Sequence, residues 1–187
     1  MRTARKLMTP DEFLNWCLGQ EGKWELVSGV PLQMMAGATE DHDRIVVNLI
    51  VTLGNKLRGG PCRPKTADQA ARIPKGNIRR PDVTIDCGPR EGKSLESTAP
   101  AVFFEVLSPS TRTFDQIKKP EEYKTVPTLK HFVLLDPDRA RAWVWTREGD
   151  AWANADTEGL DAEIALPGVG VTLSLGEIYD GVELADS

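Results

Sequence analysis

Residues 79–85 read RRPDVTI, and residues 101–107 read AVFFEVL. Both runs are rich in Val, Ile and Phe and are bounded by Pro, Gly or Ser, a pattern that favours short β-strands. The second run is apolar on both faces, as expected of a strand in the middle of a covered sheet. These two segments therefore predict neighbouring central strands around which the rest of the chain is arranged.

Glu105 interrupts the second apolar run. Burying an ionised carboxylate without a partner costs several kcal/mol, so we expect a metal ion, a cation or a hydrogen-bond donor beside it. Asp82, at the head of the neighbouring strand, is the nearest carboxylate, and Lys118 and Lys119 follow after a Ser- and Pro-containing break. Two carboxylates and a lysine at a sheet edge indicate a metal-assisted phosphodiesterase site. The residue types are equally consistent with a structural alternative, in which Asp82 ends a strand and Glu105 forms a buried salt bridge with Lys119.

The composition describes one soluble globular domain spanning residues 1–187. The chain is long enough for a full hydrophobic core, and its apolar fraction of 40% and charged fraction of 27% are ordinary for this class. No run of apolar residues is long enough to span a membrane. Cys17, Cys62 and Cys87 have no metal-ligand spacing, and their odd number predicts free thiols and a cytoplasmic location.

Charge is unevenly distributed along the chain. The net charge is −5, yet between residues 56 and 80 the only acidic residue is Asp68. The basic residues of this stretch are Lys56, Arg58, Arg63, Lys65, Arg72, Lys75, Arg79 and Arg80. Such a stripe predicts either a surface that faces nucleic-acid phosphates, with Arg63, Lys65, Arg79 and Arg80 as its contacts, or a solvated loop face.

Two helices have clear sequence signals. Thr9, Pro10 and Glu12 form a capping box at the start of the first. The second is predicted from Glu40 to about Arg58, because its apolar residues recur every four positions and Gly59-Gly60 follows.

A proline lies directly behind Lys119. Proline is costly inside a helix and favourable at its first position, so we expect a helix break or start near Lys119.

Strands are predicted at 23–27, 30–35, 62–65, 69–73, 132–135, 141–146, 163–166 and 170–173, with residues 75–77 as a turn and a short helix after Ser174. Strands mixed with few helices predict a mixed α/β fold. Trp143, Trp145 and Trp152 are expected to pack on the sheet or to form a dimer face.

Several motifs together resemble the Uma-type restriction-endonuclease family, within the PD-(D/E)-X-K nuclease superfamily. They are Pro81-Asp82, the string EVLSPST at residues 105–111, and Asp115 through Lys119 to Tyr123. The resemblance extends upstream to residues 24–29, 42 and 48, and downstream to residues 127–129, 133–137 and 175–179. It implies a restriction-endonuclease-like fold, with a central mixed β-sheet flanked by helices and extra N- and C-terminal hairpins.

The resemblance also implies a function: metal-dependent hydrolysis of DNA by a homodimer. Asp82, Glu105 and the carbonyl of Val106 would bind Mg²⁺ or Mn²⁺. The superfamily lysine lies two residues after the acid, where this chain has Leu107. The family pattern instead assigns the catalytic role to Lys119, four residues from both Asp115 and Tyr123.

The auxiliary candidates are Glu25, His42, Asp115, Lys118 and Tyr123. For Glu25, an exposed strand position is the alternative, and for His42, a capping or surface position. For the whole chain, the alternatives are a catalytically degenerate binding module for nucleic acid or protein and an enzyme that uses the same carboxylates on another substrate.

Overall fold

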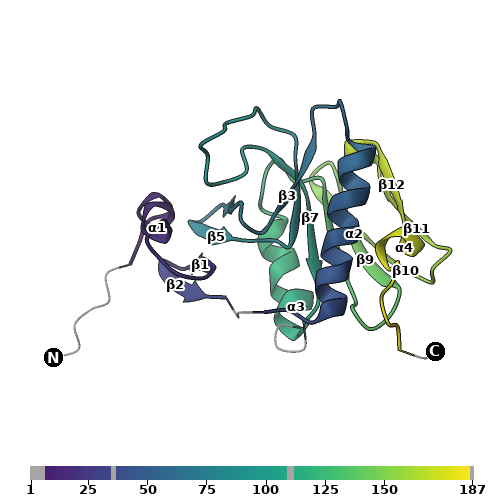
Figure 1. The fold of residues 1–187 in the computed structure, drawn as a ribbon. Coiled ribbons are helices and arrows are strands. Elements are labelled where there is room, and N and C mark those ends of the chain that lie inside the picture. Colours follow the sequence, from purple (N-terminus) through teal and green to yellow (C-terminus); the bar gives the residue numbers. More distant parts are fainter. Residues whose placement is uncertain (1–6, 35–36, 109–111, 186–187) are drawn as a thin grey trace.

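The computed structural model describes residues 7–34, 37–108 and 112–185, with the backbone alone for residues 112–117. Its helices and strands follow one another along the chain as shown in Figure 1. Their bounds are α1 Pro10–Cys17, β1 Trp24–Val27, β2 Val30–Gln33, α2 Glu40–Lys56, β3 Arg63–Thr66, β4 Ala71–Ile73, β5 Asn77–Arg79, β6 Val83–Asp86, β7 Pro100–Val106, α3 Arg112–Tyr123, β8 His131–Leu135, β9 Arg141–Glu148, β10 Ala151–Glu158, β11 Glu163–Leu166, the 3₁₀ turn η1 Pro167–Val169, β12 Val171–Ser174 and α4 Leu175–Ile178.

A six-stranded mixed sheet forms the centre of the molecule, in the order β10-β9-β8-β7-β6-β3. The β7–β8 pair is parallel and the other pairs are antiparallel. Alternate residues of β7 enter two different cores: Phe104 packs with residues of α2, whereas Phe103 packs with Tyr123 of α3. The sheet therefore lies between α2 and α3, which confirms the predicted central sheet flanked by helices (Figure 1).

Two smaller sheets complete the fold. The first has the order β2-β1-β5-β4 and packs with α1 around Phe13 and Leu26. The second is the β11–β12 hairpin near the C-terminal end of the described chain. The β1–β2 and β11–β12 hairpins are the extra N- and C-terminal hairpins that the sequence predicted.

The predicted helix starts are confirmed. The Thr9 side chain accepts from the backbone N–H of Glu12, and the Glu12 side chain accepts from the backbone N–H of Thr9, which together form the capping box. Thr39 caps α2 by accepting from the N–H of His42. Each cap satisfies a backbone donor that the helix itself leaves unpaired.

The predicted break near Lys119 is wrong. Helix α3 runs without interruption from Arg112 to Tyr123, with Pro120 inside it. Lys119 and Tyr123, on either side of the proline, both bond to Glu105 of β7. These tertiary contacts offset the roughly 3 kcal/mol that an internal proline costs.

The prediction of three free thiols is also wrong, because Cys62 and Cys87 form a disulfide and only Cys17 is free. Strands β3 and β6 pair antiparallel with Arg63 opposite Asp86. The next pair outward is Cys62 and Cys87, whose Cα atoms lie 4.0 Å apart. The inference of a reducing compartment rested on free thiols and loses that support.

Two strands were not predicted. The turn predicted at residues 75–77 ends at residue 76, and Asn77–Arg79 forms β5, which pairs with both β1 and β4. The eight-residue edge strand β10 is mostly exposed and polar, so it lacks the apolar alternation that marks a half-buried strand.

No helix in the described part of the chain is long and apolar enough to cross a membrane.

Candidate active site

Asp82 and Glu105 come together through the pairing of β6 and β7. Val83 lies opposite Phe104, and continuing that register by one residue brings Asp82 opposite Glu105. The Oδ2 atom of Asp82 accepts a hydrogen bond of 2.8 Å from the backbone N–H of Val106, which ties the end of one strand to the other. Residues directly opposite in an antiparallel pair lie within side-chain contact distance. The two carboxylates predicted to form the site are therefore neighbours.

Glu105 is 4% exposed, and one of its oxygens receives two donors. The Tyr123 hydroxyl donates to Oε1 at 2.6 Å, and Lys119 Nζ lies 2.9 Å from the same atom. Burial, followed by the negative charge of Glu105, raises the pKa of Tyr123 well above its ordinary value. Tyr123 therefore remains a protonated donor, and one oxygen of Glu105 contacts both the Tyr123 hydroxyl and the Lys119 amine.

Helix α3 places the two donors on one face. Lys119 and Tyr123 are four residues apart, which puts them one above the other on a helix. Lys118, the alternative lysine, is exposed, whereas the Lys119 side chain is only 11% exposed. The side chain of Asp115, one of the auxiliary candidates, lies outside the described residues. Among the described contacts, Lys119 is the lysine that reaches Glu105.

His42 reaches the site from the first turn of α2. Its Nε2 lies 3.4 Å from Asp82 Oδ2. Burial lowers the pKa of His42, but the hydrogen bond to Asp82 and the charges of Asp82, Glu105 and Asp43 outweigh it, so the net shift is upward. His42 is therefore a neighbour of the carboxylate pair, in addition to being the residue whose N–H is capped by Thr39.

A second charged cluster lies beside the first. The guanidinium of Arg79 donates to Glu25 Oε2 at 2.9 Å and to Glu122 Oε2 at 2.6 Å. Asn77 donates to Glu122 Oε1 at 2.7 Å, and the backbone N–H of Arg80 donates to Glu25 Oε1 at 3.0 Å. Glu25 is thus held by Arg79 of β5 and by the residue that follows it, and it is not an exposed strand residue.

Glu122 was not singled out from the sequence. Its position three residues after Lys119 marks the side of α3 on which it lies, but its partner on β5 is 43 residues away in the chain. No local pattern indicates that contact.

The predicted phosphate-facing residues are engaged inside the protein. Arg63 Nη2 lies 3.2 Å and Lys65 Nζ 2.8 Å from a single oxygen of the buried Asp86. Arg80 donates to the backbone carbonyls of residues 24, 67 and 68, and Arg79 is occupied by the two glutamates. The side chains of these four basic residues are therefore engaged by carboxylates and backbone carbonyls of the protein itself.

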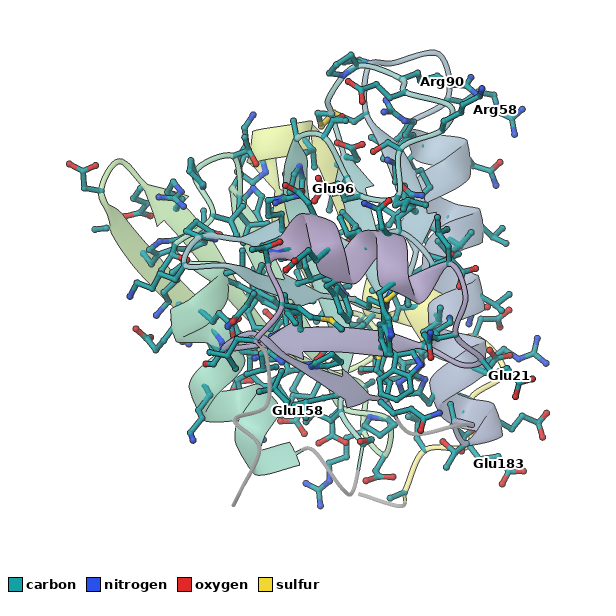
Figure 2. The ribbon with its side chains drawn as sticks, turned by 90° about the vertical axis from the view of Figure 1, so that its left-hand side faces the viewer. Glu21, Arg58, Arg90, Glu96, Glu158 and Glu183 are labelled. Carbon is teal, nitrogen blue, oxygen red and sulfur yellow. A yellow bond between two sulfur atoms is a disulfide. The ribbon has the colours of Figure 1, made fainter. Side chains whose placement is uncertain are left out.

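Exposed basic side chains gather elsewhere. Arg58 and Arg90 lie near one another beyond the C-terminal end of α2 (Figure 2). They line a cavity of about 610 Å³ beside the disulfide. His42 and the carboxylate pair lie toward the opposite end of the same helix.

The donor set suits a hard cation only in part. Asp82 and Glu105 offer carboxylate oxygens, which Mg²⁺ and Mn²⁺ prefer, and Mg²⁺ commonly retains several waters besides one or two carboxylates. Within residues 7–34, 37–108 and 112–185, no three His, Cys, Asp or Glu side chains are grouped so that they could enclose a metal ion. The residues therefore fit a cation held by two carboxylates and water, and not a closed protein cage.

Comparison with known proteins identifies the family. The model of the Uma2 family, described as "Putative restriction endonuclease", matches residues 10–176. This chain belongs to the Uma2 family. The match covers the helices and strands that carry Glu25, His42, Asp82, Glu105 and Lys119.

Two relatives and a solved structure match most of the chain. The uncharacterized protein slr1290 of Synechocystis is 30% identical over 178 residues, which are 94% of this chain and 93% of the relative. A second Synechocystis protein, the uncharacterized sll1609, is 27% identical over 164 residues, which are 85% of this chain and 92% of that protein. The crystal structure of a putative nuclease belonging to DUF820 from Anabaena variabilis superposes with a TM-score of 0.70 at 19% identity, covering 92% of this chain and 97% of the other. The fold of this Uma2 protein is thus the fold of that structure.

Proposed function

We propose that this Uma2 protein is a metal-dependent endonuclease that hydrolyses phosphodiester bonds of DNA. The observation that carries the proposal is that Asp82 accepts from the Val106 N–H at 2.8 Å and so lies at the end of β7 beside Glu105, with Lys119 Nζ 2.9 Å from the Glu105 carboxylate. Two carboxylates and one lysine supply the groups that metal-assisted phosphodiester hydrolysis requires. Membership of the Uma2 family supports the nuclease class.

Each residue has a distinct role in this proposal. Asp82 and Glu105 hold Mg²⁺ or Mn²⁺, with the carbonyl of Val106 as a further ligand by family resemblance. The cation supplies a nucleophilic water and charge neutralisation at the phosphoryl oxygens. Lys119 donates to a phosphoryl oxygen or orients the water, and Tyr123 fixes Glu105. His42 restrains Asp82 through their 3.4 Å contact.

Metal binding is the first test of the proposal. Titration calorimetry with Mn²⁺ should show binding to the wild type and a large loss of affinity in Asp82→Ala. Equal Mn²⁺ affinity in the two proteins would exclude Asp82 as a ligand. Because the Lys119 amine is not a ligand, Lys119→Ala should bind Mn²⁺ nearly as well as the wild type.

The second test is cleavage of plasmid and single-stranded DNA with Mn²⁺. Lys119→Ala should cut about a hundred- to a thousandfold more slowly, the loss typical of removing one donor to developing negative charge. Lys118→Ala is the matched control, since its exposed side chain is one residue away, and it should keep its rate. A dead Lys118→Ala beside an active Lys119→Ala would overturn the assignment of the lysine.

One observation favours a second candidate function, a nuclease-fold binding module that does not cut. The Glu105–Lys119 pair is already a satisfied buried ion pair, as the structural alternative requires. A wild type that cuts neither DNA substrate with Mg²⁺ or Mn²⁺ yet binds one of them would select this function.

A further inference from the structure

We propose that Arg79 is a positioning residue of this site: it holds helix α3 against β1 and β5 so that Tyr123 and Lys119 meet Glu105. The effect of Arg79 on catalysis rests on the proposed function. The role of Arg79 in holding α3 rests only on the contacts that its side chain makes. It assigns to Arg79 a role different from phosphate binding.

The position of Arg79 is unsuited to contact with a nucleic acid. The residue is 3% exposed, and its side chain is enclosed between a strand of the small sheet and α3. An arginine that binds DNA phosphates must present its nitrogens to solvent. Here the nitrogens face two carboxylates, at 2.9 Å for Glu25 and 2.6 Å for Glu122.

The contact with Glu122 has the forked geometry that fixes orientation. Nε of Arg79 lies 3.1 and 3.2 Å from the two oxygens of Glu122, and Nη2 lies 2.6 Å from one of them. Planar guanidinium–carboxylate pairs of this kind restrict angle as well as distance. Asn77 adds a third donor to the same carboxylate at 2.7 Å, so two residues of β5 hold one side chain of α3.

Glu122 is adjacent to the residues that reach the site. It directly precedes Tyr123 and follows Lys119 by three positions, and both of these bond to Glu105. The backbone of α3 lacks one hydrogen-bond donor in this turn because of Pro120. The turn that presents Tyr123 and Lys119 is therefore fixed from outside, by Glu105 on one side and by Arg79 on the other.

Glu25 completes the support on the far side. It accepts from Arg79 and from the backbone N–H of Arg80, three and two residues before Asp82. The same guanidinium thus connects the segment leading into Asp82 with the helix that carries the lysine. The four-stranded sheet is, on this inference, part of the framework of the active site.

The experiment uses the two tyrosines of the chain, Tyr123 and Tyr179. Protein labelled with ¹³C at tyrosine Cζ gives two signals, and each reports the hydrogen bond of its own hydroxyl. Tyr179 donates to the carbonyls of Asp136 and Arg141, away from Arg79, and serves as the internal reference. Tyr123→Phe assigns the spectrum by removing one signal.

Arg79→Lys and Glu122→Gln should each shift the Tyr123 signal and leave the Tyr179 signal in place. Glu121→Gln is the matched control, because Glu121 is the neighbouring, 72% exposed glutamate that pairs with Lys124, and it should move neither signal. An unchanged Tyr123 signal in both Arg79→Lys and Glu122→Gln overturns the inference. If Arg79→Lys unfolds, so that both signals move, Glu122→Gln alone decides.

The DNA-cleavage assay separates positioning from phosphate binding. Misplacement of a catalytic group lowers the rate on the order of tens to a hundredfold, so Arg79→Lys should lower kcat, with KM and its salt dependence unchanged. A phosphate contact would instead raise KM and reduce the salt slope by about one; that result overturns the inference. If the wild type lacks cleavage activity, the proposed function fails while the Tyr123 signal still decides the role of Arg79.

Discussion

Glu105 shows how a single buried carboxylate is stabilised without any charge on its own strand. Both neighbours on β7 are apolar, and its donors come from α3. A hydrogen bond to a charged acceptor contributes more than one to a neutral acceptor, because the acceptor would otherwise remain poorly solvated.

Tyr123→Phe should therefore destabilise the protein by about 1.5–3 kcal/mol, since it removes a donor from buried Glu105. Tyr179→Phe is the control: its hydroxyl donates to two neutral carbonyls, so the cost should be smaller, about 0.5–1.5 kcal/mol. Urea unfolding of both variants measures the difference. Equal costs for the two would show that the charge of Glu105 adds nothing to the Tyr123 bond.

His131 is a buried histidine held in its neutral form. The backbone N–H of Gly168 donates to Nε2 at 3.0 Å, so that nitrogen carries no proton, and Nδ1–H faces Thr146 Oγ1 at 3.1 Å. Burial, followed by the nearby charge of Lys130, lowers the pKa of His131 to about 4. Between that value and about 6.5, the unfolded chain binds a proton at this residue that the folded protein does not.

Stability should accordingly fall as the pH falls from about 6.5 toward 4, because the unfolded state takes up more protons in that window. His131→Gln should flatten the dependence between pH 7.5 and 5.5, where few carboxylates titrate. Urea midpoints measured across this range for the wild type and the variant test the prediction. The contribution of His42, the other histidine, is common to both proteins and cancels in the comparison. If the urea midpoints of the wild type and His131→Gln changed with pH in parallel, the predicted role of His131 would be wrong.

At the scale of elements, the outer end of the β3–β6 pair is fastened twice. The disulfide joins Cys62 to Cys87, and one residue further in, Asp86 binds Arg63 and Lys65. Burial raises the pKa of Asp86. Hydrogen bonds from Lys65 and from the backbone N–H groups of residues 99 and 88 lower this pKa by more than burial raises it, so the net shift is downward. The ionised carboxylate and the covalent link thus fix the same edge of the central sheet.

Reduction of the disulfide should lower the free energy of unfolding by about 3–4 kcal/mol, the chain-entropy expectation for closing a loop between residues 25 apart. Unfolding in urea with and without dithiothreitol measures the change. The Cys62→Ser/Cys87→Ser variant should match the reduced protein and be insensitive to reductant. Two free thiols at positions 62 and 87 in protein kept oxidised would contradict the structure at this edge.

For the whole molecule, the aromatic edge of the sheet predicts self-association. Trp145 stacks on Phe132 at 5.1 Å between ring centroids, while Trp143 and Trp152 are half-buried beneath Arg141 and Arg147. Aromatic and arginine side chains are enriched in interface cores. We expect a homodimer through this edge. Sedimentation at tens of micromolar should give twice the monomer mass of 20.6 kDa, and Trp152→Glu should shift it toward the monomer. A monomeric wild type would refute the prediction.

The sequence predicted features that depend on neighbouring residues and features marked by a residue of unexpected type. Glu105 inside an apolar run required a partner, and Asp82 was found by assuming that adjacent runs pair. The Thr9 capping box spans three residues, so it was readable directly. In contrast, the Arg79–Glu122 fork and the Cys62–Cys87 link join residues that only the sheet topology brings together. Pro120 was misread because a tertiary contact on each side of it outweighed its intrinsic preference.

The parallel pairing of β7 and β8 has a consequence for the inheritance of the site. Its connection is the crossover that contains α3, and β6 directly precedes β7 in the chain, so the residues from Asp82 to Tyr123 lie on one short piece of gene. Recombination between two relatives could exchange residues 77–135 and carry the carboxylates, the lysine, Arg79 and Glu122 together. Glu25, on β1, would stay behind with the recipient. A chimaera should therefore be productive only when the recipient strand supplies an acidic residue at that position.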